Sequence, residues 1–195
     1  MSTRLAPRLE RTAPALLWAL AAGVYTALAV VRPGAVSVEL AVYYALAAVM
    51  FLQRREKERS GPTWSVLLAW SAAVLPLFSM HCPDAGPELG VVLRVVGLAW
   101  MIYSIRSLGP GFGIAPTDRG LVTRGAYRVV RHPLYAGEMM FFLGCLAGNP
   151  TWQKGVVVLI EVTADLVRIH VEEKVIRGYE RYARMVRWRL LPGLF

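Results

Sequence analysis

The chain alternates between long apolar blocks and short polar connections. Six apolar blocks follow one another, at residues 12–31, 38–52, 63–80, 89–105, 134–147 and 151–169. The first has no charged residue and, as a helix, is long enough to cross roughly 30 Å of hydrocarbon. The fifth is too short to cross comfortably alone, and a Gly-Asn-Pro turn joins it to the sixth. The pattern predicts an all-α integral membrane protein with about five to six transmembrane helices, the last two forming a C-terminal helical hairpin.

The polar connections divide the chain into two parts. Residues 1–107 contain four predicted transmembrane helices, and residues 108–195 contain a long loop, the hairpin and a basic tail. Hydrophobic residues make up 56% of the chain, with six Trp and eight Tyr. That fraction exceeds the usual content of soluble domains, and Trp and Tyr are enriched at membrane interfaces.

The net charge of +9 is unevenly placed along the chain. Lys and Arg gather in residues 1–11, 53–59 and 106–132 and in the C-terminal tail, whereas 32–37 and 81–88 carry little positive charge. Because cytoplasmic loops are enriched in Lys and Arg, both termini are expected in the cytoplasm and the protein in a plasma (inner) membrane. Basic residues beside apolar blocks indicate contact with anionic lipid headgroups rather than nucleic acid.

Ionisable residues interrupt the last apolar block. Glu161, Asp165, Arg168 and Glu172 are spaced by four, three and four, so they share one stripe of a helix. Charged groups at membrane depth usually face a protein interior or a wet cavity, and Glu138 is placed to face the same cavity. The sequence therefore predicts a polar pocket on the cytoplasmic side. An alternative remains open in which Glu172 and Glu173 are cytoplasmic and pair with Lys174 or Arg177.

The remaining arginine, cysteine and histidine side chains near the apolar blocks give no sign of a second functional site. Arg94 lies one turn into its block and is expected to extend to the membrane interface. Cys82 and Cys145 suggest neither a disulfide framework nor a zinc site. His81 and His170 lack partners at metal-ligand spacing, so no metal is expected.

A glycine-punctuated segment, residues 120–137, joins the fourth and fifth blocks. Arg131 and His132 precede Pro133, which favours a helix start, and unpaired amide groups there suit an anionic ligand. A basic juxtamembrane loop with an ordinary helix cap is the alternative.

Three motifs in this region occur in a fixed order. They are Leu121-Val-Thr-x-Gly-x-Tyr127-x-x-x-Arg131-His-Pro-x-Tyr135-x-Gly137, then Asn149-Pro150, then Arg168-Ile-x-x-Glu172-Glu173. The order resembles the isoprenylcysteine carboxyl methyltransferase family, and phosphatidylethanolamine methyltransferases share a related pattern. The resemblance covers roughly residues 108–192. The chain departs from it after Glu173, where the Phe-Gly element before the paired tyrosines is missing, and at Met185, where an arginine is common.

The resemblance implies a membrane methyltransferase that uses S-adenosyl-L-methionine, with residues 108–195 as its catalytic region. It implies carboxyl methylation of an isoprenylcysteine-type or other lipophilic acceptor, with Arg168 holding the acceptor as the catalytic residue. The implied cofactor-binding residues are Gly120, Leu121, Val122, Tyr127, His132, Pro133, Leu134, Tyr135 and Glu172. The match is much less specific for the acceptor than for the superfamily.

Four alternatives stay open. A phospholipid amine or a small thiol is another possible acceptor. Membrane sterol reductases have a similar C-terminal region that binds NADPH, although they are usually longer. A non-catalytic membrane protein whose basic loops bind anionic lipid is the fourth.

Overall fold

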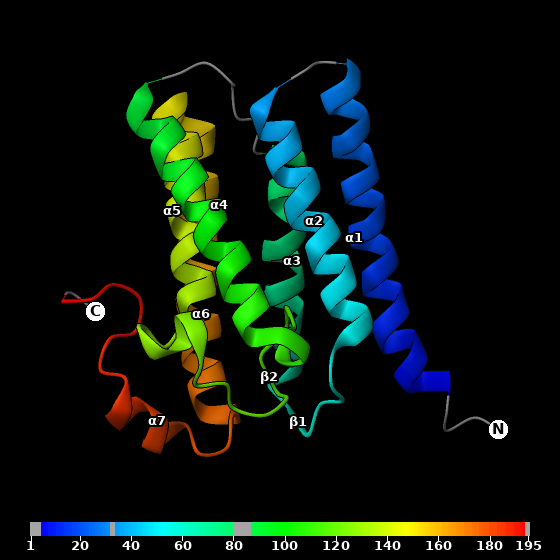
Figure 1. The fold of residues 1–195 in the computed structure, drawn as a ribbon, viewed down its shortest axis with the longest axis vertical. Helices are drawn as coiled ribbons and strands as arrows, with labels where there is room; N and C mark the ends of the chain where they lie inside the picture. Colours follow the sequence, from blue (N-terminus) through cyan, green and yellow to red (C-terminus); the bar gives the residue numbers. More distant parts are fainter. Residues whose placement is uncertain (1–4, 32–33, 80–86, 194–195) are drawn as a thin grey trace.

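A computed structural model describes residues 5–31, 34–79 and 87–193. The described part of the chain contains seven α-helices and two short strands (Figure 1). The helices are α1 (Leu5–Val31), α2 (Ala35–Gln53), α3 (Thr63–Ser79), α4 (Glu88–Leu108), α5 (Pro133–Gly148), α6 (Trp152–Val175) and α7 (Tyr179–Met185). The prediction of a mostly helical protein is confirmed. The strands β1 (Arg59–Ser60) and β2 (Thr117–Asp118) were not expected.

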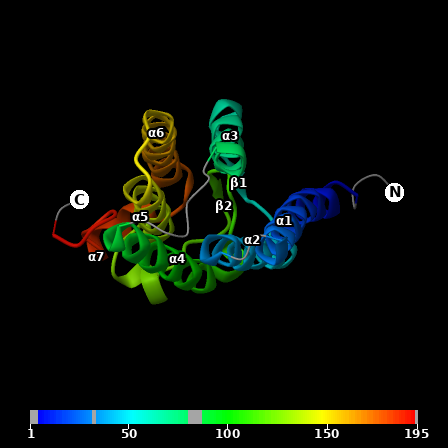
Figure 2. The same cartoon turned by 90° about the horizontal axis from the view of Figure 1, so that it is seen from above.

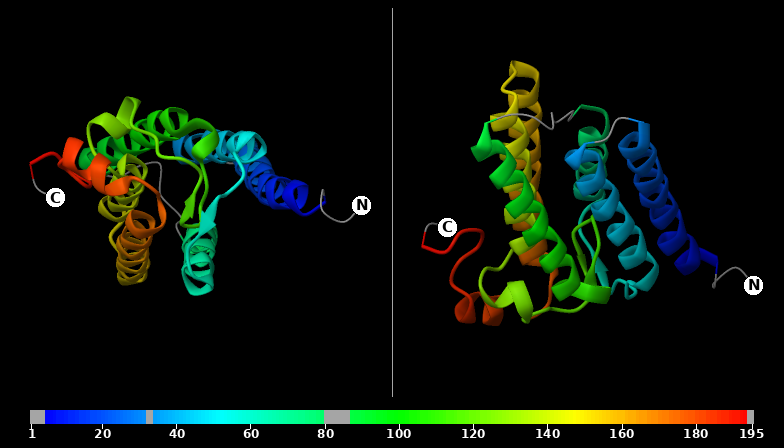
Figure 3. Two further views of the ribbon diagram at one scale, coloured as in Figure 1. Left: turned by 90° about the horizontal axis from the view of Figure 1, so that it is seen from below. Right: turned by 45° about the horizontal axis from the view of Figure 1, so that its top comes forward.

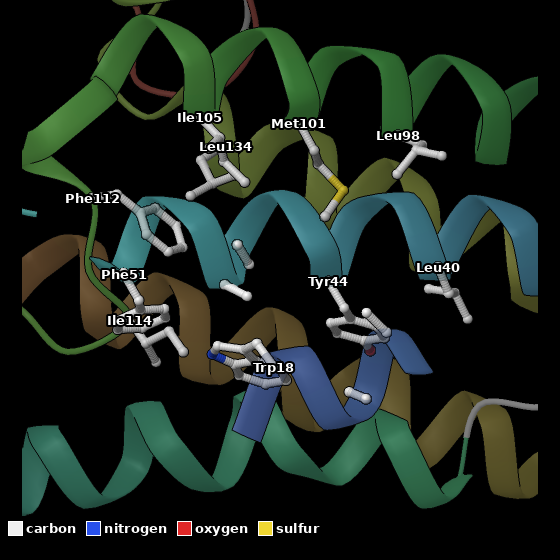
Figure 4. Close-up of a cluster of buried hydrophobic side chains, with 14 of the residues drawn as sticks. Trp18, Leu40, Tyr44, Phe51, Leu98, Met101, Ile105, Phe112, Ile114 and Leu134 are labelled. Carbon is white, nitrogen blue, oxygen red and sulfur yellow. The ribbon is translucent and has the colours of Figure 1, made fainter. Parts of the chain in front are cut away.

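The long helices form two layers. Seen from above, α4, α2 and α1 lie in a row, and α3 and α6 lie on one side of that row with α5 between α4 and α6 (Figure 2). The closest helix pairs are α4 with α5 and α1 with α2, while α3 packs against α6. Aromatic and aliphatic side chains of α1, α2 and α4 meet between the layers, where Trp18 stacks on Tyr44 at a ring-centroid distance of 5.3 Å (Figure 4).

The outer surface of the bundle is apolar. Large side chains such as Leu16, Leu20, Leu67 and Leu159 are exposed, as expected for a surface that faces lipid. Two helical stretches, Thr12–Val31 and Glu88–Gly111, are long and apolar enough to cross a membrane. Three shorter apolar stretches lie at Ser37–Gln53, Thr63–Val74 and Pro133–Gly148. These features are those of a helical membrane protein, and the number of spans stays a prediction.

Small residues let α4 and α5 approach closely. A Cβ atom on Gly97 would lie 2.9 Å from the carbonyl oxygen of Gly137, and one on Gly144 would lie 2.8 Å from that of Gly90. Both distances are too short for a real side chain, so these glycines are required by backbone contact. Close backbone approach at small residues is a common way for membrane helices to associate.

Arg94 is not at the membrane interface. Its side chain is 1% exposed, and its Nε atom lies 3.1 Å from a carboxylate oxygen of Glu39 on α2. The prediction that Arg94 extends to the interface is therefore wrong. A carboxylate on a neighbouring helix supplies the counter-charge that makes burial tolerable.

Cys145 on α5 is fully buried and forms a disulfide bond. The expectation that the cysteines form no disulfide is therefore wrong. The other cysteine of the sequence, Cys82, lies outside the described residues.

The polar connections gather at one end of the bundle. The strands, α7 and the first turns of α1 all lie at this end (Figures 1 and 3). Arg59 pairs with Asp118 and Ser60 with Thr117 in an antiparallel register, which ties the connection between α2 and α3 to the loop after α4. Residues 53–59, residues 106–132 and the C-terminal tail, which carry most of the basic residues, therefore lie at the same end of the bundle.

Candidate functional site

A pocket lies where these connections meet, and we call it the loop pocket. It is bounded by the loop after α4, the start of α5 and the end of α6. Its lining includes Gly120, Leu121, Val122, Tyr127, His132, Leu134, Tyr135 and Glu172. Pro133 is fully buried as the first residue of α5 and does not line it. The structure thus brings together every predicted cofactor-binding residue except Pro133.

Asp118 shapes the wall of this pocket. Gly120 has φ of +90°, which glycine adopts without strain, and its amide donates to a carboxylate oxygen of Asp118 at 3.0 Å. The other oxygen accepts from the backbone amide of Arg177 at 3.1 Å, just beyond α6. Asp118 therefore fixes the glycine turn to the end of α6. No sequence pattern points to Asp118, because the amide that it accepts from, that of Arg177, lies 59 positions away.

The start of α5 places polar groups on the opposite wall. Pro133 occupies the first helical position, after His132, so the first-turn amides lack helical partners. The Tyr135 hydroxyl donates to Glu172 Oε1 at 2.6 Å, and His132 Nδ1 lies 3.8 Å from Glu172 Oε2. The pocket thus combines a carboxylate, an imidazole and a helix N-terminus, which suits a ligand that carries both positive and negative charge.

Glu173, next to Glu172, faces away from the pocket lining and into a network. Its carboxylate accepts two hydrogen bonds from Arg189 at 3.0 and 3.1 Å and one from the Tyr179 hydroxyl at 2.9 Å. Burial alone would raise the pKa of Glu173, but hydrogen bonds from His132, Arg189 and Tyr179 outweigh it and lower the pKa to about 2. Arg177, one of the two partners considered for Glu172 and Glu173, pairs instead with Glu58 at 3.5 Å.

A second pocket lies inside the helix bundle, and we call it the bundle pocket. Figure 4 shows many of its apolar side chains. Its lining consists of Trp18, Leu40, Tyr43, Tyr44, Ala47, Ala72, Ala73, Leu98, Met101, Phe112, Gly113, Ile114, Leu134, Glu138, Phe141, Phe142, Glu161 and Arg168. Gly113 and Leu134 line both pockets, so the two pockets adjoin.

Arg168 stands at the polar end of the bundle pocket. It donates to Asp165 at 3.0 Å and to the Ile114 carbonyl at 2.9 Å, and its guanidinium lies 4.7 Å from the centre of the Tyr135 ring. Glu138 Oε2 lies 3.9 Å from Arg168 and its Oε1 accepts from the Tyr43 hydroxyl at 3.3 Å. Glu138 thus faces the same pocket as Glu161 and Arg168, whereas Glu172, the last member of the predicted stripe, lines the loop pocket.

The bundle pocket also holds polar atoms without partners among the described residues. Glu161 lines the pocket with only 3% exposure, and its Oε1 atom has no hydrogen bond. One carboxylate oxygen of Asp165 and the Nε atom of Arg168 are in the same condition. Unpaired buried polar atoms are costly, so this arrangement is suited to a polar group delivered by a ligand.

No metal site is apparent in the described ranges, where no group of three or more His, Cys, Asp or Glu side chains could hold an ion. The polar side chains that line the two pockets are carboxylates, an imidazole, hydroxyls and the guanidinium groups of Arg119, Arg131 and Arg168.

Comparison with known proteins places this region among methyltransferases. No curated protein matches the chain. Residues 87–181, just under half of the chain, match the family described as phospholipid methyltransferase. The matched residues run from the start of α4 into α7 and include the predicted cofactor-binding residues and Arg168. That family is related to the isoprenylcysteine carboxyl methyltransferases, and the match supports a membrane methyltransferase of this class for the matched residues.

Proposed function

We propose that this protein transfers a methyl group from S-adenosyl-L-methionine to a lipophilic acceptor. The observation that carries the proposal is the adjoining pair of pockets, one among the loops with His132 and Glu172 in its lining, the other inside the bundle and largely apolar. The loop pocket would receive the cofactor and the bundle pocket the acceptor. Gly113 and Leu134, which line both, would then border the path of the methyl group.

The residues of the loop pocket fit this cofactor. The Glu172 carboxylate suits its amino group or ribose hydroxyls, and the first-turn amides of α5 suit its carboxylate. Leu108, Val122 and Ile176 add apolar surface for a flat base. When bound, the cofactor supplies a methyl group on a sulfonium that is already a good leaving group. The protein therefore has mainly to align donor and acceptor and to exclude water.

The resemblance implies that the acceptor is the carboxylate of an isoprenylcysteine-type molecule. Arg168 is the residue suited to holding it, since guanidinium groups bind carboxylates in a bidentate manner. In the structure its guanidinium already contacts Asp165 and Ile114. A carboxylate acceptor would have to bind the remaining Nε face or displace Asp165.

A lipid amine is a second candidate acceptor, favoured by the charges around Arg168. Three carboxyl groups, those of Glu138, Glu161 and Asp165, face a single arginine. The unpaired oxygen of Glu161 could accept a hydrogen bond from an ammonium group. The tyrosines Tyr43 and Tyr44 line the same space, and aromatic faces attract cations.

Calorimetric titration of S-adenosylhomocysteine into detergent-solubilised protein tests the cofactor. We expect saturable binding that Glu172→Gln weakens about tenfold, as for the loss of a hydrogen bond to a charged group. Glu180→Gln, an exposed change on α7, is the matched control and should bind normally. No binding by the wild-type protein would refute the proposal, and binding of NADPH instead would favour a reductase. If neither ligand binds, the result would favour a non-catalytic membrane protein whose basic loops bind anionic lipid.

A methyl-transfer assay with labelled donor separates the acceptors. The panel contains a farnesylated cysteine derivative and phosphatidylethanolamine. For a carboxylate acceptor, Arg168→Gln should abolish transfer while Glu161→Gln has little effect. For an amine acceptor, Glu161→Gln should raise the acceptor KM about tenfold or more. Transfer to neither compound by a protein that binds the cofactor would exclude both acceptors.

A further inference from the structure

The C-terminal segment that follows α7 is fastened to the start of α5. The Arg131 amide donates to the Trp188 carbonyl and the His132 amide to the Arg189 carbonyl, each at 2.9 Å. Leu190 is buried in a small cluster with Tyr135, Ala136 and Ile169. The segment therefore holds the backbone from which His132 enters the loop pocket.

The side chain of Arg189 continues this attachment. It grips Glu173 through two hydrogen bonds, and Arg131 lies 3.5 Å from the same carboxylate. These contacts keep Glu173 ionised, in agreement with its lowered pKa of about 2. Neither Arg189 nor Glu173 lines the loop pocket. Any effect of Arg189 on a ligand there must pass through other residues.

Glu173 reaches His132 both directly, with Oε1 at 3.4 Å from His132 Nε2, and through Tyr179. Burial, followed by the nearby Glu173 charge, raises the pKa of Tyr179 well above its ordinary value, so the hydroxyl keeps its proton. That hydroxyl donates to Glu173 Oε1 at 2.9 Å, and its oxygen lies 2.8 Å from His132 Nε2. Because the Tyr179 proton is committed to Glu173, the oxygen is left to accept a proton from Nε2. A neutral imidazole then carries its hydrogen on Nε2 and presents an acceptor at Nδ1, on the side of Glu172.

We propose that Arg189 is a positioning residue for the loop pocket. Through Glu173 and Tyr179 it fixes His132 in the tautomer that carries hydrogen on Nε2, with Nδ1 directed at the cofactor. This inference rests on the proposed function for its ligand, but the tautomer is a property of the protein alone. The C-terminal tail would then orient His132 in the loop pocket without lining that pocket itself.

Nitrogen NMR of histidine-labelled protein in detergent tests the tautomer. The chain has three histidines, and the spectrum of His132→Gln assigns the signal of interest. In mildly alkaline buffer we expect the wild-type signal to be that of the Nε2–H form. Arg189→Ala should give a mixture of both tautomers, and Tyr179→Phe should lose a smaller share of the Nε2–H form, because Nε2 keeps Glu173 Oε1 as an acceptor at 3.4 Å. Arg189→Lys, which keeps the charge, should retain most of the Nε2–H form.

The same variants are titrated with S-adenosylhomocysteine. Arg189→Ala should weaken binding about tenfold, and Tyr179→Phe and Arg189→Lys less. Arg184→Ala removes an exposed arginine from α7 and should change neither binding nor the tautomer. Thermal unfolding and gel filtration identify any variant that does not fold. If Arg189→Ala does not fold, the comparison of Arg189→Lys and Tyr179→Phe with the wild-type protein provides the test.

Two results would overturn the inference. One is a wild-type His132 with hydrogen on Nδ1. The other is an Arg189→Ala protein with unchanged tautomer and unchanged affinity. If wild-type protein binds no S-adenosylhomocysteine while the tautomer depends on Arg189, the proposed function and the cofactor half of the inference fail together, and the positioning of His132 stands.

Discussion

At the scale of single residues, buried arginines in this protein lie beside carboxylates of other helices. Arg94 pairs with Glu39 on α2, and Arg168 contacts Glu138 on α5 in addition to Asp165 on its own helix. The polar stripe on α6 could be predicted, because its members recur at helical spacing. The burial of Arg94 could not, because its partner is 55 positions away in the sequence and no local pattern joins the two residues.

The pair Arg94 and Glu39 leads to a stability prediction. Arg94→Leu should destabilise the protein by about 3–5 kcal/mol, since it leaves the Glu39 carboxylate without its counter-charge. Adding Glu39→Leu should recover much of that loss, because replacing both partners by apolar groups is often neutral. Thermal unfolding in detergent measures both effects. A double variant as unstable as the single one would contradict this account.

Glu173 leads to a prediction about pH. Its pKa is lowered from 4.5 to about 2, so its contribution to stability is complete above 4.5 and is lost as the pH falls toward 2. The unfolding midpoints of wild-type protein and Glu173→Gln should therefore differ most near neutral pH and converge on acidification. A gap that stays constant across this range would show that the Glu173 charge does not stabilise the fold.

At the scale of elements, the helix positions followed from hydropathy and the contacts between them did not. The apolar blocks coincide with α1 to α6 to within a few residues at most ends, since long runs of apolar residues define the helices. The β1–β2 pair was missed because two-residue strands have no periodicity to detect. The motifs predicted correctly which residues gather around the loop pocket. The hydrogen bonds of Asp118, Tyr179 and Arg189 could not be predicted, because they join segments whose contact is not visible in the spacing of residues along the chain.

The glycine contacts between α4 and α5 can be tested with a matched pair of variants. Gly144→Ala would place a Cβ atom 2.6 Å from the Arg94 amide nitrogen, and overpacking of this kind costs about 1–3 kcal/mol. Gly155→Ala on α6 has open space around its Cβ and should stabilise the protein by about 0.4–1 kcal/mol, through a less flexible unfolded chain. Unfolding midpoints compare the two. Equal effects would mean that α4 and α5 can separate without cost.

At the scale of the whole molecule, the polar connections at one end of the bundle create a strong asymmetry. The connections that carry most of the arginines are those that build the loop pocket. From the charge distribution we therefore predict that the loop pocket faces the cytoplasm.

This orientation is tested by fusing reporters to either terminus in a bacterial host. Fluorescent protein fused to each terminus should fluoresce, and alkaline phosphatase fused at the same points should be inactive, because both termini are expected inside. An active phosphatase fusion at the C-terminus would reverse the orientation and place the loop pocket outside the cell.

The wall shared by the two pockets, Gly113 and Leu134, has a consequence for how rates should be measured. Under the proposed function, one reactant arrives from water and the other from the bilayer. The abundance of the first is expressed per litre of solution, whereas that of the second is a mole fraction of the lipid. Adding inert lipid at fixed protein and acceptor should therefore slow turnover by surface dilution, while diluting the whole sample in buffer at constant cofactor should leave the rate per protein molecule unchanged.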